Sequence, residues 1–378
     1  MVRLPVKRLK EGMIVAQSVY NNHGGSYLVK GNPLSTSYIE KLSKIGIPTV
    51  NVTSPDPNFK ILPPDDIVQE HTRINAIQKV YDTFTAVEAS GRLDTRSLQN
   101  ISEQIIFDVI DRRENLVQLT DIRLHDTYTF AHSVNVAILS AMLGLLCHYS
   151  KKDLIVLTLG ALLHDLGKID VAADILTKTT RLRPDEFEII KQHPLAGAKR
   201  IQLMSARLPS PDILATIAAQ HHEHIDGSGY PHGLKGSKIH KFSKLVAIAD
   251  VYDALTSERP YKKAYMPHIA YNIMVNLDRG QFDPHLLSLF FNNVAIYPVG
   301  TILKTIYGYG IVKETVFGRS ETPTIVVFAD LNGKLKEPRL IDLATAYSEQ
   351  KKILQVLVDN ELRHFIQLIK IDPSIYLK

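Results

Sequence analysis

The stretch LIVLTLGALLHDLGK, residues 154–168, joins an apolar segment to the most informative pair of polar residues in the sequence. Leu154 to Leu163 are apolar on nearly every face of a helix, which predicts a buried central helix. His164 and Asp165 follow directly, and imidazole and carboxylate together suit Fe, Mn, Zn or Ni. Lys168 stands four residues after His164. On a continuing helix both would face one site, where the lysine could hold a phosphate.

Further His and Asp residues lie in the apolar helical segments around this stretch. His132 stands in a run from Phe130 to Cys147, and Asp250 follows the apolar residues 245–249. Each has an ordinary alternative: His132 as a hydrogen-bonded core residue, and Asp250 as a helix cap or a partner of Arg259. An unpartnered carboxylate in a core is costly, however, and metal coordination offsets that cost. Together these positions form a candidate ligand set: His132, His164, Asp165, His193, His221, His222 and Asp250.

Apolar periodicity divides the chain into regions of different character. Short apolar runs between turn signals predict a small α+β module at the N-terminus, and prolines mark a linker after it. Helical spacing then continues until β-branched runs and the hairpin signal Asn332-Gly333 predict a small β module, closed by a helix from about Glu349 to Ile369. The fold class is therefore mainly α, a helical bundle flanked by two small modules. The predicted regions are 1–53 (α+β module), 54–66 (linker), 67–96 (connector helix), 97–293 (helical domain) and 294–378 (β module plus helix).

Composition excludes several classes of protein. At 378 residues with 45% apolar content, the chain can bury a large core. The net charge of +5 is mild, and acidic residues interleave with the basic ones, which is not typical of nucleic-acid binding. No apolar run is long enough for a membrane span, and the N-terminus lacks a signal core. The single cysteine, Cys147, excludes a disulfide within one chain, so we expect a cytoplasmic location.

The region around the candidate ligands resembles the HD-GYP family. The motifs that carry the resemblance occur in the family's order and spacing: Tyr128–Ser133, His164–Lys168, His193-Pro194, His221–Glu223, Asp226–Pro231 and Asp250–Lys262. The resemblance implies an all-helical HD-superfamily fold and hydrolysis of cyclic di-GMP to linear pGpG, with a second cut to GMP left open. The N-terminal module is similar to a small module often found before HD-GYP domains.

The resemblance also implies roles for individual residues. The seven candidate ligands would hold two divalent ions, Fe or Mn first and Ni or Zn as alternatives, with Asp165 bridging and a bridging hydroxide as the nucleophile. Tyr128 replaces a glutamate that supports a third ion in some family members, so we expect two. Asp165 and Lys168 would be catalytic. The substrate contacts implied are Lys168, Gly229, Tyr230, Arg259 and Lys262.

Two alternatives from the sequence remain open. The domain could bind a cyclic dinucleotide without cleaving it and act as a sensor, although sensors usually lose ligands that this chain retains. It could also hydrolyse a related substrate such as cyclic GMP-AMP. The expected partners are cyclic di-GMP and signalling proteins such as diguanylate cyclases. We expect neither nucleic acid nor a membrane span among them. The helix that starts near Ile67 could carry contacts to a second copy of the chain, but we favour the alternative that it packs on the next domain.

Overall fold

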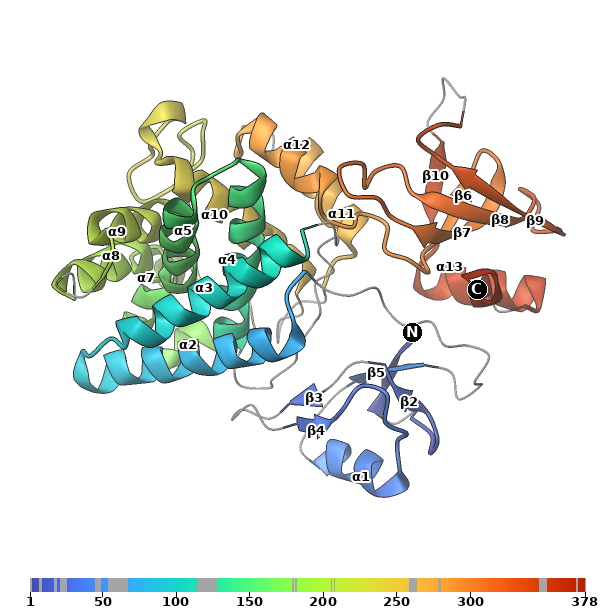
Figure 1. Ribbon diagram of the computed structural model, residues 1–378, viewed down its shortest axis with the longest axis horizontal. Helices are drawn as coiled ribbons and strands as arrows, with labels where there is room; N and C mark the ends of the chain where they lie inside the picture. The colour runs from blue at the N-terminus through green and yellow to red at the C-terminus, as the bar shows by residue number, and fades with distance from the viewer. Residues whose placement is uncertain are drawn as a thin grey trace. The chain divides into compact units, whose positions relative to one another are not determined.

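The computed structural model divides the chain into two compact units, shown in Figure 1. A helical unit contains residues 66–290, and a second unit comprises residues before and after it in the sequence. The predicted region boundaries remain predictions, and the linker at 54–66 lies outside the described residues. The structure describes residues 2–6, 9–16, 19–20, 26–44, 49–53, 67–113, 128–178, 180, 182–204, 206, 208–257, 264–277, 280–346, 352–371 and 373–377.

No helix among the described residues is long and apolar enough to cross a membrane. The helical unit confirms the predicted bundle. Its elements are α2 (Glu70–Ser90), α3 (Thr95–Asp111), α4 (Tyr128–Leu146), α5 (Lys151–Leu163), the 3-10 helix η2 (Leu166–Asp170), α6 (Ala173–Leu176), α7 (Pro184–Ile190), α8 (His193–Leu203), α9 (Pro211–Gln220), the 3-10 helix η4 (Gly236–Lys238), α10 (Lys241–Thr256), α11 (Pro267–Asn272), the π-helix η5 (Ile273–Leu277) and α12 (Pro284–Asn292).

Helices α4, α5 and α10 form the centre of this unit. Every residue of α5 from Val156 to Leu163 is buried, as its uniform hydrophobicity predicts. Ser150 caps the N-terminus of this helix, because its hydroxyl accepts a hydrogen bond from the backbone N–H of Asp153. Helix α4 packs against α5 and α10, and α9 packs against α5 and α8. The candidate ligands therefore stand on, or at the ends of, helices that pack against one another.

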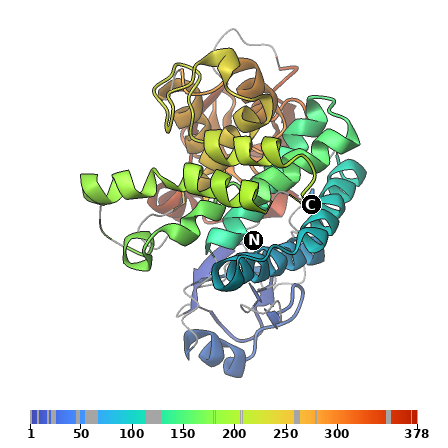
Figure 2. The same cartoon turned by 90° about the vertical axis from the view of Figure 1, so that its left-hand side faces the viewer.

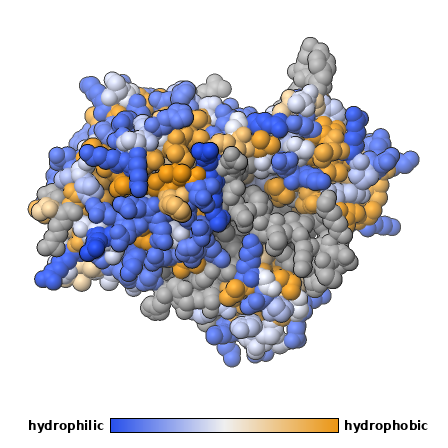
Figure 3. Space-filling view, in the orientation of Figure 1, coloured by the Kyte–Doolittle hydropathy of each residue, from blue (hydrophilic) through white to orange (hydrophobic). Residues whose placement is uncertain are grey.

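Helix α2 packs against α3 and α4, which confirms the prediction that the connector helix lies on the helical domain. Figures 1 and 2 both show α2 and α3 side by side along one edge of the unit. The Phe130 ring on α4 makes edge-to-face contacts with Tyr81 and Phe84 of α2, with ring centroids 5.2 and 5.6 Å apart. On the face of the molecule drawn in Figure 3, hydrophilic and apolar side chains are interspersed over the helical unit.

The N-terminal region is a small α+β module, as expected. An antiparallel sheet has the order β1 (Val2–Pro5), β5 (Thr49–Thr53), β2 (Ile14–Val15), and β3 (Val19–Tyr20) pairs with β4 (Ser26–Leu28). Helix α1 (Thr36–Lys44) starts after Ser35, whose hydroxyl accepts from the Tyr38 N–H. Strands β1 and β3 were not predicted from the sequence; they are short, with four and two residues.

The C-terminal region contains one antiparallel sheet of order β10-β6-β7-β8-β9. The strands are β6 (Ile302–Thr305), β7 (Gly308–Glu314), β8 (Thr324–Ala329), β9 (Leu335–Asp342) and β10 (Ile353–Val356). Asn332-Gly333 lies in the β8–β9 turn, as predicted. The predicted helix from Glu349 was wrong over its first part: residues 353–356 pair with β6, and helix α13 spans only Asp359–Ile369 before the 3-10 helix η6 (Pro373–Leu377). The pairing with β6 is a long-range contact that local periodicity does not reveal.

Candidate metal centre

Three of the candidate histidines stand at helix ends, and the helix ends orient their rings. His164 follows α5, His221 follows α9, and His193 begins α8 directly after the α7 turn. In each ring Nδ1 donates to the backbone carbonyl three residues earlier. These carbonyls belong to Ala161, Ala218 and Ile190, at 2.7, 2.8 and 2.7 Å. A carbonyl oxygen only accepts, so Nδ1 carries the proton and each Nε2 presents an unprotonated lone pair to the centre.

The candidate ligands form two triads. Among the described residues, the ligand atoms of His132, His164 and Asp250 lie within 4.8 Å of one another, and so do those of His193, His221 and His222. A third grouping, His164, Asp165 and His221, takes one residue from each triad and adds Asp165 between them. All the members are buried except His222, which is half-buried.

Asp165 directs one oxygen to each triad. Its Oδ2 lies 3.3 Å from His164 Nε2 and 3.7 Å from His132 Nε2. Its Oδ1 lies 3.3 Å from His193 Nε2 and 3.9 Å from His221 Nε2. One carboxylate with its two oxygens in two different imidazole clusters has the arrangement of a bridging ligand.

Several buried atoms of the centre have no partner that satisfies them in the described residues. His193 Nε2 and His221 Nε2 face each other at 3.1 Å although both ring protons are committed to backbone carbonyls. His164 Nε2 and Asp165 Oδ1 are buried without any hydrogen bond. Opposed lone pairs and an unpaired carboxylate oxygen are costly in a dry interior, and a divalent cation among them removes that cost. The donor set therefore fits divalent metal ions.

The surroundings hold most of the ligands in the charge state that metals require. Burial works against ionised carboxylates, but the imidazoles and Lys168 keep the pKa of Asp165 well below its usual value, and His132 and His222 do the same for Asp250. Burial lowers the pKa of His222 to about 3. Burial and the surrounding imidazoles also hold the pKa of His221 well below its usual value. Metal ligands must be anionic carboxylates and neutral imidazoles, which this pattern provides.

His132 behaves differently from the other imidazoles. Burial opposes its charged form, but the carboxylates Asp250 and Asp253 outweigh burial and raise its pKa to about 9. Its Nε2 lies 3.0 Å from Asp250 Oδ1. Without a metal ion, a proton on this ring compensates the local negative charge. A metal ion at the same position would replace that proton.

Lys168 reaches the centre by a different route from the predicted one. Helix α5 ends at Leu163, and Lys168 belongs to the 3-10 helix η2, so it is not placed over His164 by a continuing α-helix. Its Nζ instead donates to Asp165 Oδ2 at 2.5 Å, while the side chain stays 26% exposed. The partly exposed ammonium group therefore lies between the Asp165 carboxylate and solvent.

Close packing of η2 against α8 fixes the distance between Asp165 and His193. A Cβ on Gly167 would lie 2.0 Å from the His193 carbonyl oxygen and 2.4 Å from Gly197 N. Both obstacles are backbone atoms, which cannot rotate away. The glycine of the His-Asp motif is therefore required by the close approach of two backbones.

The glycine-rich loop also packs against the ligands. A Cβ on Gly229 would lie 2.5 Å from the His222 carbonyl oxygen and 2.4 Å from His224 N, so only glycine fits. Tyr230 N donates to the His222 carbonyl at 3.1 Å, and its ring lies over the His222 ring with centroids 4.8 Å apart. Burial, with the charges of Asp250 and Asp165, raises the pKa of the Tyr230 phenol, which therefore stays protonated.

Two carboxylates near this loop order it. Glu223 accepts from the backbone N–H groups of His232 and Leu234 at 2.7 and 2.8 Å, and Asp226 accepts from Ser228.

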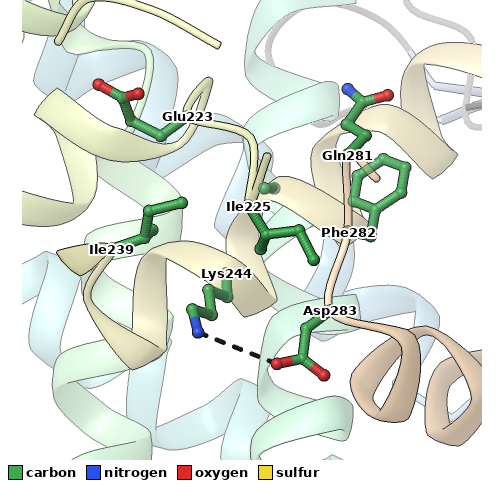
Figure 4. A pocket seen from close by; sticks show the side chains of 8 residues that line it. Glu223, Ile225, Ile239, Lys244, Gln281, Phe282 and Asp283 are labelled. Atoms are coloured by element: carbon green, nitrogen blue, oxygen red, sulfur yellow. Dashed lines mark ion pairs between the residues drawn. The ribbon is translucent and has the colours of Figure 1, made fainter. Parts of the chain in front are cut away.

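Figure 4 shows a pocket beside the loop, crossed by the Lys244–Asp283 ion pair at 3.9 Å. At about 10 Å³ it holds roughly one water, and no candidate ligand lines it. It is therefore not a dinucleotide site.

Some predicted residues lie outside the described part of the chain. Arg259 and Lys262 do so entirely, and the structure gives the backbone of Tyr128 in α4 but not the position of its side chain. The predicted contacts of Arg259 and Lys262 remain predictions.

The sequence reasoning missed the residues behind His132. Asp253 is fully buried, and its Oδ2 lies 2.7 Å from His132 Nδ1; its Oδ1 accepts from Asn135 Nδ2 at 2.8 Å. The available signal was helical spacing, since Asp253 follows Asp250 by three residues and Asn135 follows His132 by three. A carboxylate behind a ligating histidine is a common feature of metal sites.

All seven candidate ligands lie within a segment that matches a known protein family. Residues 102–286 match the family model for the HD domain. A cyclic di-GMP phosphodiesterase of Pseudomonas aeruginosa is 35% identical over 272 residues, covering 71% of this chain and 64% of that protein. A 3'3'-cGAMP-specific phosphodiesterase of Vibrio cholerae is 35% identical over 157 residues, covering 42% of this chain and 33% of that protein. The chain thus spans less than two thirds of the length of these curated relatives.

A solved HDGYP protein from Bdellovibrio bacteriovorus has a TM-score of 0.47 and 19% identity, covering 76% of this chain and 96% of that one. The HD domain implies divalent metal binding, and the His and Asp clusters of this chain are able to hold metals. Residues 102–286 of this chain therefore belong to the HD-domain family, and the chain is similar to the cyclic di-GMP phosphodiesterase of Pseudomonas aeruginosa.

Proposed function

We propose that this chain is a metal-dependent phosphodiesterase that hydrolyses cyclic di-GMP to linear pGpG. The observation that carries the proposal is the placement of the two Asp165 oxygens in two separate triads. Such a carboxylate suits a dinuclear centre, and dinuclear centres catalyse in-line displacement at phosphate. The relatives in Pseudomonas aeruginosa and Vibrio cholerae support a cyclic dinucleotide as the substrate.

In this proposal the seven candidate residues hold two divalent ions, Fe or Mn first and Ni or Zn as alternatives. When bound, the ions would supply an activated water and neutralise charge on the phosphate oxygens. The ligand set accepts several metals, so availability decides which is bound. The ligands would be His132, His164 and Asp250 on one side and His193, His221 and His222 on the other, with Asp165 shared between them.

The chain's own groups would bind and orient the phosphodiester. Lys168 is partly exposed and lies 2.5 Å from Asp165, so its ammonium can shift from this carboxylate to a phosphate oxygen entering the site. The Tyr230 phenol stays protonated beside His222 and can donate to the ligand, and Gly229 keeps the loop backbone close. Arg259 and Lys262 complete the proposed contacts, with the arginine fork suited to phosphate or guanine.

A second substrate, cyclic GMP-AMP, is kept as an alternative because a relative of 35% identity bears that specificity in its name. The two substrates share the phosphodiester chemistry and differ in one base. The described residues around the centre include no group that distinguishes guanine from adenine. We rank cyclic di-GMP first because the relative that covers 71% of the chain bears that name.

The test is turnover by the full chain, purified anaerobically under reducing conditions and loaded with Mn²⁺ or Fe²⁺. Chromatography should show pGpG accumulating from cyclic di-GMP, and chelation of the metal should stop it. Cyclic GMP-AMP is assayed in parallel, and the ratio of kcat/KM values decides the preferred substrate. If the metal-loaded protein binds the nucleotide but releases no product, the enzyme proposal fails and a sensor role replaces it.

A further inference from the structure

Helix α2 contains a charged side chain that is almost completely buried. Arg73 is 1% exposed and is one of the largest fully buried side chains among the described residues. Its Nη1 donates to Asn135 Oδ1 on α4 at 2.5 Å. A guanidinium group only donates, so the amide of Asn135 must turn its oxygen to Arg73 and its NH₂ group away from it.

The NH₂ group of Asn135 connects this contact to the candidate metal centre. Asn135 Nδ2 donates to Asp253 Oδ1 at 2.8 Å, and Ser257 Oγ donates to the same oxygen at 3.0 Å. The other oxygen, Oδ2, lies 2.7 Å from His132 Nδ1. Because a carboxylate only accepts, His132 donates here and its Nε2 is left for the metal side. In the series of hydrogen bonds that links Arg73 to the His132 ring through Asn135 and Asp253, the donor and the acceptor of each bond are therefore fixed.

The helix that carries Arg73 is held firmly. Tyr81 and Phe84 pack edge-to-face on Phe130 of α4, and the backbone N–H of Gln69 donates to Asp108 of α3 at 2.9 Å. The match to the HD-domain model starts at residue 102, within α3, so Arg73 lies outside the matched segment. A helix that precedes the matched domain thus reaches the outer side of its metal centre.

We propose that Arg73 and Asn135 are positioning residues for the metal ligand His132, acting through Asp253. The relay Arg73–Asn135–Asp253–His132 fixes the ring orientation and tautomer that metal binding needs. This inference rests on the proposed function insofar as His132 is taken as a ligand. It makes α2 part of the metal-binding unit.

The experiment measures Mn²⁺ affinity of the full chain by calorimetry and compares two variants with a matched control. Arg73→Met keeps the volume of the side chain but removes the donor, and Asn135→Leu interrupts the relay at its middle. Val80→Ala is the control, since Val80 is fully buried on the same helix and does not belong to the relay. We expect each relay variant to weaken Mn²⁺ binding about 10–100-fold, while Val80→Ala lowers Tm and leaves the affinity unchanged.

Two further readouts separate positioning from folding. The double variant should bind Mn²⁺ no more weakly than either single variant, because both changes interrupt one relay. The Co²⁺-loaded relay variants should show a changed visible absorption spectrum, and Arg73→Lys should recover part of the affinity. If Arg73→Met does not fold, the Mn²⁺ affinity and the Co²⁺ spectrum of Asn135→Leu test the inference instead. Wild-type affinity and spectrum in a folded relay variant would overturn the inference. A wild-type chain that binds none of Mn²⁺, Fe²⁺, Ni²⁺ and Zn²⁺ would instead refute the proposed function.

Discussion

Replacing Gly167 by alanine tests whether the His-Asp motif and His193 are held together by backbone packing. The new Cβ would lie 2.0 Å from the His193 carbonyl oxygen, and ordinary contact begins near 3.4 Å, so η2 and α8 must separate by about 1.4 Å. Ligand constellations tolerate roughly 0.5 Å of displacement. A misplacement of about 1 Å costs on the order of 100-fold in rate. We therefore expect Gly167→Ala to lower kcat about 100-fold and to weaken Mn²⁺ binding.

The control for this variant is Gly144→Ala on α4. There the new Cβ would meet the side-chain ends of Leu157 and Leu154, at 2.6 and 2.9 Å, which can move, and the Tyr149 ring at an ordinary contact distance of 3.6 Å. Calorimetric Mn²⁺ titration, Tm and steady-state turnover are measured for both variants. Gly144→Ala should keep wild-type metal affinity. If Gly167→Ala also keeps wild-type affinity and turnover, the argument from backbone contact is refuted.

Three other predictions concern the centre itself. Asp165→Ala removes the carboxylate shared by both triads, so metal content measured by elemental analysis and turnover should both be lost; retained turnover would exclude a bridging role. Lys168→Ala should keep its metal and lose about 100-fold or more in kcat, and an unchanged kcat would exclude a phosphate contact. The His132 pKa of about 9 means that below this pH an ion must displace a proton. Apparent Mn²⁺ affinity should therefore rise up to about tenfold per pH unit towards pH 9. Calorimetry in two buffers at pH 7.5 should show about one proton released, and no release would contradict the assignment.

The sequence predicted the parts of the site that local pattern encodes. Uniformly apolar runs identified α4 and α5, and ligand chemistry selected the His and Asp residues that the fold brings into two triads. A buried Asp250 was informative because an unpartnered carboxylate is costly in a core. These inferences need only composition, spacing and the cost of burying charge.

The parts that the sequence did not reveal depend on long-range contacts. Lys168 was expected on a continuing helix, whereas the chain leaves the α-helix at His164 so that η2 can pack on α8 through Gly167. Arg73 looks like an ordinary surface residue until its helix is placed against Asn135 of α4. Residues 353–356 form a strand only because β6 offers an edge. Each of these contacts joins segments that are distant in the sequence, so a short stretch of sequence does not predict it.

The most direct test of the dinuclear account is turnover measured against metal bound per chain. Metal-free protein is titrated anaerobically with Mn²⁺, and pGpG formation from cyclic di-GMP is followed at each ratio. Because Asp165 directs an oxygen to each triad, we expect activity to develop with the second ion bound and to reach its plateau at two. Full turnover with one ion per chain, or intact cyclic di-GMP at two, would contradict the account.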